Sequence, residues 1–332
     1  MGLLVDGRWQ DRWYDTSASG GRFVREDAQF RHVIGAPDGR YPAESGRYHL
    51  YVSLACPWAH RTLIVRSLKG LDEHIGVSVV SPIMLENGWT FDKSEGSSGD
   101  AIYDYGFMHQ LYTHAATSYS GRVTVPVLWD RHSESIVNNE SAEIIRMLGV
   151  AFDELTGDTL DLYPLALRDR IDVWNRRIYP AINNGVYRAG FATTQEAYEE
   201  AYRDVFAELD HLDSHLQSHR YLTGAALTEA DIRLFTTLIR FDAVYHGHFK
   251  CNRQRLEDYA AIAPYIRDIY QLPGVAATVD FEQIKTHYYA SHGSINPTHI
   301  VPLGPIIDFT RAHNRRQLAQ ASQIAALTPA SM

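Results

Sequence analysis

The stretch RYHLYVSLACPWAHRTLIVRSLKGLDEHIGVSVV, residues 47–80, decides the fold. Its first six residues, 47–52, are rich in Tyr, Leu and Val and favour a strand. Pro57 then stands where a helix tolerates proline, in the first turn, and apolar residues follow at helical spacing up to Gly70. The run IGVSVV at 75–80 favours a second strand. Residues 47–80 therefore predict a strand–helix–strand unit of about the length that such units have.

Two further β-rich runs follow this unit, at 123–129 and at 135–137, with the spacing of a hairpin. Pro126 lies within the first run. Because a central strand resists proline, we place it at the start of the strand, where a cis bond can precede it. The polar stretch 86–100 has the character of an insertion, and 103–115 is expected to be a helix. These segments complete a small β/α domain.

The chain turns helical from about residue 160. Between 198 and 216, apolar residues recur at intervals of four and three, which predicts a bundle helix whose capping box begins at Thr193. A second box, Thr228-Glu-Ala-Asp231, marks the start of another helix. The proline-containing run 296–305 cannot be helical and must lie as a tail across the body. The predicted organisation has four segments: an N-terminal extension at 1–46, an α/β domain at 47–150, an all-helical domain at 151–290 and a tail at 291–332.

The composition is that of an ordinary soluble globular protein, with 45% hydrophobic and 21% charged residues among 332. The formal charge is 31 − 40 = −9, which argues against a nucleic-acid or anionic-membrane surface. No run approaches the roughly 20 apolar residues of a membrane helix, and the first residues lack the pattern of a signal peptide. Two cysteines, Cys56 and Cys251, cannot build a disulfide framework and suit a reducing cytoplasm. Cys251 follows His246-Gly-His248 at no standard zinc spacing, so no metal site is expected.

Cys56 is the candidate nucleophile. It stands at the start of the first predicted helix, where unpaired N–H groups and the helix dipole favour an anion and lower the pKa of a thiol. The commonest role of a free cysteine is that of a small buried hydrophobe, but the placement beside Pro57 favours the thiolate. Position 59 is alanine, so the motif Cys-Pro-Trp-Ala holds no resolving thiol. A mixed disulfide formed at Cys56 must therefore be resolved by an external thiol.

The order of the elements carries a resemblance to known proteins. A strand, Cys-Pro at a helix start and Val-Pro before a hairpin resemble a thioredoxin-like domain, and an all-helical domain behind it resembles the glutathione transferase architecture. Six strings, in order along the chain, are more specific: SLACPWAHRTLIVRSLKGL (53–71), NGWTF (87–91), RVTVPVLWD (122–130), IVNNES (136–141), NNGVYRAGFATTQEAYEEA (183–201) and HYYASHGSINPTHIVPLGP (287–305). Together they closely resemble the glutathionyl-hydroquinone reductases, the Xi class of glutathione transferases, over nearly the whole chain.

The resemblance implies a glutathione site formed by Trp89, Arg122, Val125, Glu140 and Ser141. Glu140 and Ser141 stand at a helix start, where backbone N–H groups bind a carboxylate and an acidic side chain pairs with an ammonium; both groups occur at the γ-glutamyl end of glutathione. The same two residues also suit a plain helix cap. Val125 would offer its backbone N–H and C=O to the cysteinyl peptide, and Arg122 would bind the glycyl carboxylate. Without the resemblance, Trp89 would be assigned to the core and Arg122 to a solvated loop.

For the second substrate, the resemblance implies Tyr187 and Tyr288. Their phenols would hold a hydroquinone and donate to a ring oxygen as charge develops there. Tyr289 adjoins Tyr288, and the choice between them stays open. His60 and Arg61 are expected to support the first helix, and His292 either to line the pocket or to cap the tail.

The implied reaction is the glutathione-dependent reduction of S-glutathionyl hydroquinones through a Cys56–glutathione mixed disulfide. Glutathione is the co-substrate, no metal or nucleotide is expected, and the resemblance implies a homodimer. Two alternatives remain: an omega-like thioltransferase or dehydroascorbate reductase, which shares the cysteine and the glutathione site, and a non-catalytic glutathione-binding module on the same fold. Conjugating activity is disfavoured, since conjugating enzymes use Tyr or Ser where this chain has Cys56.

Overall fold

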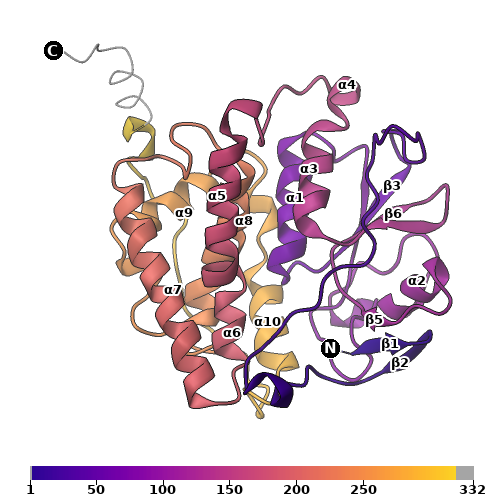
Figure 1. Cartoon of the computed structure of the whole chain (residues 1–332), viewed down its shortest axis with the longest axis horizontal. Helices are drawn as coiled ribbons and strands as arrows, with labels where there is room; N and C mark the ends of the chain where they lie inside the picture. Colours follow the sequence, from indigo (N-terminus) through magenta and orange to yellow (C-terminus); the bar gives the residue numbers. More distant parts are fainter. Residues whose placement is uncertain (1, 319–332) are drawn as a thin grey trace. The chain divides into compact units, whose positions relative to one another are not determined.

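The computed structural model describes residues 2–318 and is shown in Figure 1. Its contacts divide these residues into two compact units. The first unit comprises 2–15, 24–160 and 277–303, and the second comprises 16–23, 161–276 and 304–318. Each unit is therefore assembled from segments that are far apart in the sequence.

The first unit is built on the predicted strand–helix–strand stretch. β3 (Tyr48–Val52) leads into α1 (Pro57–Leu68) and then into β4 (Gly76–Val79), which pairs in parallel with β3. β6 (Val127–Asp130) and β7 (Ser135–Asn138) form the predicted hairpin and give a sheet of order β4-β3-β6-β7, in which β6 is antiparallel to β3. Every residue of β3 and β6 is buried, as in strands covered on both faces.

Four helices accompany α1 in the first unit: α2 (Met108–Ala115), α3 (Ser141–Val150), α4 (Asp153–Thr156) and α10 (Phe281–Ser291). α1 and α3 pack against each other and lie side by side in Figure 1. The predicted helix at 103–115 is too long at its start, because Asp104 has a left-handed φ of 57° and Phe107 bridges to Thr90. No separate helix was predicted at α10, although it lies at the end of the segment predicted as all-helical, because its buried side chains include only one aliphatic residue, Ile284, beside His287 and Tyr288.

The N-terminal extension contains strands where none was predicted. β1 (Leu3–Val5) and β2 (Arg8–Gln10) form an antiparallel hairpin, and β1 also pairs with β5 (Gly121–Arg122). The two turn residues, Asp6 and Gly7, have φ of 47° and 72°. An Asp-Gly pair is the strongest short-range hairpin signal, but these strands have only three residues each and are too short to show alternation.

The second unit is helical, as predicted. Its α-helices are α5 (Arg168–Ile178), α6 (Gly185–Gly190), α7 (Gln195–Leu216), α8 (Glu229–Arg240) and α9 (Ile262–Tyr270). The predicted box at the start of α8 is confirmed, with Thr228 and Asp231 capping each other's backbone N–H. The predicted cap of α7 is wrong by one residue. Thr194 accepts from the N–H of Ala197 at 3.3 Å, whereas the hydroxyl of Thr193 bonds to that of Thr16 at 2.9 Å.

The run 296–305 is free of helix, as its prolines require. Among the residues that the structure describes, no helix is long and apolar enough to cross a membrane.

Candidate active site

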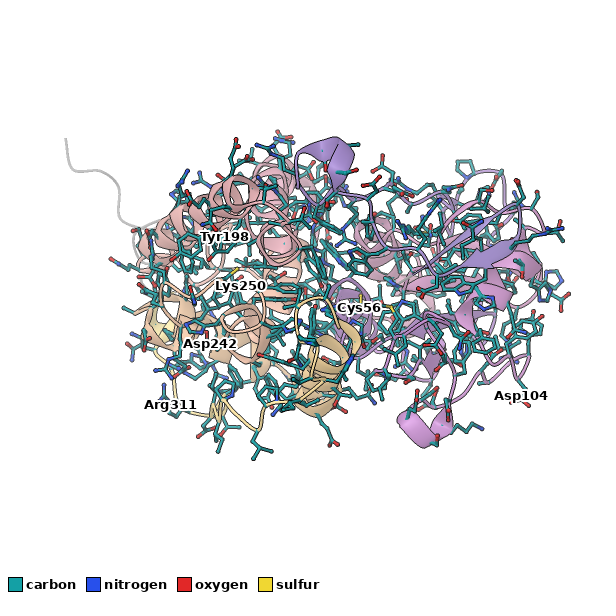
Figure 2. All side chains as sticks on the ribbon, turned by 90° about the horizontal axis from the view of Figure 1, so that it is seen from below. Cys56, Asp104, Tyr198, Asp242, Lys250 and Arg311 are labelled. Carbon is teal, nitrogen blue, oxygen red and sulfur yellow. The ribbon has the colours of Figure 1, made fainter. Side chains whose placement is uncertain are left out.

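Cys56 is the N-cap residue of α1, as expected from its place before Pro57. Its carbonyl accepts the first helical hydrogen bond, from the N–H of His60 at 3.0 Å. The thiol donates to the carbonyl oxygen of Val125 at 3.6 Å, and the Val125–Pro126 peptide is cis. Figure 2 marks Cys56, whose side chain is only 8% exposed. The helix start and the Val-Pro turn, 69 residues apart, thus meet at the sulfur.

Glu140 and Ser141 form the start of α3. The Glu140 carboxylate accepts from the N–H of Ala142 at 2.9 Å and from the Ser141 hydroxyl at 3.4 Å. The Ser141 oxygen also accepts from Nη1 of Arg61 at 3.2 Å. Arg61 lies on α1 and its guanidinium packs 4.5 Å from the ring centre of Trp58. The two residues therefore act as a helix cap, and a buried arginine ties that cap to the helix that carries Cys56.

Arg122 is not a solvated loop charge. It is 9% exposed, and its Nη1 donates to the carbonyl oxygen of Arg12 at 2.6 Å. Its guanidinium carbon lies 4.0 Å from the ring centre of Tyr14, and its Nε lies 3.8 Å from a carboxylate oxygen of Glu26. All three partners come from the N-terminal extension. The extension thus covers a predicted ligand of the glycyl carboxylate.

Trp89 lies on the irregular segment between β4 and α2 and is 4% exposed. Its carbonyl accepts from the N–H of Met108 at 2.9 Å. Its indole stacks on the imidazole of His287, with ring centres 4.8 Å apart and planes 22° apart. Its orientation is therefore set by side-chain packing rather than by a regular element.

Tyr288 lies on α10 and is almost completely buried, whereas Tyr289 is partly exposed. The Tyr288 ring is edge-on to His287 at 5.2 Å and to His292 at 5.5 Å. His292, the C-cap residue of α10, also packs against Trp13 at 6.2 Å. Within the first unit, then, α10 brings the predicted phenol into the same aromatic cluster that holds Trp89.

Tyr187 belongs to the second unit, on α6. Its ring packs among four aromatic side chains of that unit, with centres 5.5–6.5 Å away: Phe23, Phe191, Tyr245 and Phe249. The assignment of Tyr187 to the hydroquinone remains a prediction.

Cys251 is fully buried in the second unit, and burial raises the pKa of its thiol to about 12. It is therefore a neutral, buried thiol, as suits a structural role. Within residues 2–318 no group of three or more His, Cys, Asp or Glu side chains is placed to hold a metal ion.

Sequence reasoning missed the structural part played by three groups. His287 lies in the quoted string HYYASH, but no role was predicted for it, and the prediction concerned the adjacent tyrosines. Arg61 was expected only to support its own helix, and its bond to Ser141 spans 80 residues. The extension residues Arg12 and Tyr14 carry no motif that could have linked them to Arg122.

Comparisons with known proteins identify the two domains and their relatives. The family models described as glutathione S-transferase N-terminal domain and C-terminal domain match residues 55–151 and 195–268. The chain is 57% identical to "Glutathionyl-hydroquinone reductase YqjG" of Escherichia coli (95% of this chain, 98% of the relative). It is 53% identical to "Glutathionyl-hydroquinone reductase PcpF" of Sphingobium chlorophenolicum (92% and 96%).

Solved structures give the same result. The glutathione-bound structure of YqjG from Escherichia coli is 54% identical, with a TM-score of 0.87 over 95% of this chain and 99% of that one. A Xi-class transferase from Natrialba magadii is 48% identical, with a TM-score of 0.89 over 96% and 97%. The chain belongs to the glutathionyl-hydroquinone reductases, the Xi class of the glutathione S-transferase superfamily.

Proposed function

We propose that this enzyme reduces S-glutathionyl hydroquinones to hydroquinones with glutathione as the reductant. The observation that carries the proposal is the position of Cys56 at the N-cap of α1, with its sulfur 3.6 Å from the carbonyl of Val125. The names of the 57% and 53% identical relatives support the same substrate class.

In the first step, the Cys56 thiolate attacks the sulfur of the substrate's glutathionyl group. A sulfur–sulfur bond forms, the sulfur–carbon bond to the ring breaks, and the ring carbon receives the electron pair and a proton. In the second step, a free glutathione thiolate attacks the glutathionyl sulfur of the mixed disulfide and expels Cys56. The sum is one glutathionyl hydroquinone plus one glutathione giving one hydroquinone plus glutathione disulfide. Dividing the substitution into two steps is the usual advantage of a covalent intermediate.

The phenols of Tyr187 and Tyr288 assist the first step in this proposal. A ring carbon is a poor leaving group unless the ring exists transiently as a protonated keto form, and phenol donors at a ring oxygen stabilise the charge that develops. Replacing either tyrosine by Phe is expected to lower kcat by about a hundredfold. Tyr289→Phe decides the open choice on α10: it should leave kcat within about threefold of wild type, and a loss as large as that of Tyr288→Phe would move the role to Tyr289.

The covalent step is tested by incubating the protein with a glutathionyl hydroquinone without free glutathione and measuring its intact mass. We expect one added glutathionyl group and one released hydroquinone per active site. Cys56→Ala should form no adduct, while Cys251→Ala is the matched control and should form it fully. Normal turnover by Cys56→Ala would overturn the mechanism.

Thioltransferase activity is a second candidate, because a 49% identical relative from Schizosaccharomyces pombe is named "Glutathione S-transferase omega-like 2". Both reactions pass through the same mixed disulfide, so the adduct alone does not distinguish them. Turnover of a glutathionyl hydroquinone and of a glutathione mixed disulfide should be compared at equal enzyme concentration. Tyr288→Phe should lose activity toward the glutathionyl hydroquinone but keep activity toward the mixed disulfide, because a disulfide has no ring oxygen to protonate.

We also propose that the enzyme works in the cytoplasm as a homodimer. Two cysteines, one of them a working thiolate, are suited to a reducing compartment. Light scattering of the purified protein tests the dimer, and a monomer mass at working concentration would contradict it.

A further inference from the structure

The segment 81–91, which carries Trp89, lacks regular structure apart from isolated bridges between Leu85 and Gly88 and between Thr90 and Phe107. A side chain on such a segment has no helix or strand to fix its direction. Binding of a ligand against the face of the Trp89 indole therefore depends on the side chains that pack against the indole.

α10 supplies that packing through two residues one helical turn apart. The Nδ1–H of His287 donates to the carbonyl of Pro82 at 2.9 Å, and the imidazole lies flat against the Trp89 indole. The hydroxyl oxygen of Ser291 accepts from the N–H of Met84 at 2.9 Å. A carbonyl only accepts, so the bond to Pro82 fixes both the tautomer of His287 and the plane of its ring.

The same helix carries Tyr288, which adjoins His287 in the chain and meets its ring edge-on. His292 is edge-on to both rings, at 5.5 Å from each. A displacement of His287 would therefore shift both the Trp89 indole and the Tyr288 phenol.

We propose that His287 is a positioning residue. It holds the Trp89 indole in the orientation that binds glutathione and couples that subsite to Tyr288. This inference rests on the proposed function and on the predicted contact of Trp89 with glutathione. A stacked ring pair contributes about 0.5–1.5 kcal/mol, which corresponds to a weakening of glutathione binding by about two- to tenfold when the stack is lost.

The test measures the dissociation constant of glutathione by calorimetry in Cys56→Ser protein, which cannot form the covalent adduct. His287→Asn keeps an N–H for Pro82 but loses the ring, and His287→Phe keeps the ring but loses the N–H. We expect His287→Asn and His287→Ala to weaken binding by about two- to tenfold and His287→Phe to recover most of the loss.

Two comparisons separate positioning from general damage. In a Trp89→Ala background, His287→Ala should have no further effect on glutathione binding, because His287 acts through the indole. His215→Ala is the control. It removes a His–Trp ring contact of similar distance, to Trp174 at 4.7 Å, in the second unit, which carries none of the predicted glutathione residues, and it should leave the dissociation constant within about twofold.

Wild-type binding by both His287→Asn and His287→Ala, beside weak binding by Trp89→Ala, would overturn the role of His287 and leave the proposed function standing. Full additivity of His287→Ala and Trp89→Ala would overturn it as well. Unchanged binding by Trp89→Ala would instead remove Trp89 from the glutathione site, and the inference with it. Since the alanine variant can fail to fold, the Asn and Phe pair keeps the test decisive.

Discussion

Tyr112, on α2, carries a buried hydroxyl that is hydrogen-bonded to two parts of the proposed site. The phenol donates to the carbonyl of Thr124 at 2.9 Å and accepts from the amide of Asn139 at 3.1 Å and from the N–H of Thr124 at 3.3 Å. Thr124 precedes Val125, and Asn139 precedes Glu140. One oxygen atom thus ties the Val-Pro turn to the start of α3.

Tyr112→Phe removes that oxygen and leaves one acceptor and two donors without this partner. A hydrogen bond contributes about 1 kcal/mol net, so the free energy of unfolding should fall by about 2–3 kcal/mol. Urea titration followed by circular dichroism measures the loss. Tyr119→Phe is the matched control. It removes a phenol that makes one bond, to the carbonyl of Arg122 at 3.2 Å, and should cost about 1 kcal/mol.

The reasoning also predicts weaker glutathione binding in Tyr112→Phe, because the turn and the helix cap lose their common anchor. A loss of stability no greater than that of Tyr119→Phe would refute the assignment of three bonds to this hydroxyl.

Three further predictions concern other buried groups. Burial lowers the pKa of His49 and of His248 to about 4 from 6.5. Because the fold disfavours their protonation, their contribution to stability is complete above pH 6.5 and is lost as the pH falls toward 4. Between pH 6.5 and 4, each histidine should lower the free energy of unfolding by up to about 1.4 kcal/mol per pH unit. Urea titrations over this range should show a smaller decrease for His49→Gln than for the wild type. The neutral, buried Cys251 should resist alkylation in the native protein, so peptide mapping should find label on Cys56 alone; equal labelling of both would contradict this. Asp231 accepts hydrogen bonds from Leu222, Thr228 and Tyr265. Asp231→Ala should therefore lower the free energy of unfolding by about 3 kcal/mol or more. A loss below about 1 kcal/mol would show that these donors find other partners.

Local patterns were enough to predict the framework of both units. Cys56 before Pro57, the parallel strands around α1 and the box at Thr228 all depend on residues close in the chain. Contacts across long separations were not predictable in the same way. No spacing rule links Arg61 to Ser141 or Trp89 to His287, because nothing in either segment specifies its distant partner.

α10 shows a second limit. A helix that buries His287 and Tyr288 against the first unit does not show a regular apolar stripe, so a hydrophobicity pattern misses it. Its identification as a separate helix needed the tertiary contacts themselves, and those contacts group α10 with the first unit, although it lies in the segment 151–290 that the sequence predicts as all-helical.

The pairing of β1 with β5 bears on how this enzyme can be shortened. The matched N-terminal family model starts at residue 55, which would suggest a removable leader before it. Yet Leu3 is the register partner of Arg122, and Arg12 and Tyr14 hold its guanidinium. A chain trimmed to the family boundary would lose β3 from the central sheet and the whole support of that arginine. Deletions before residue 55 would therefore remove contacts of Arg122, a proposed ligand of glutathione, and a fusion partner attached at the N-terminus would lie next to the strand that pairs with the strand of Arg122.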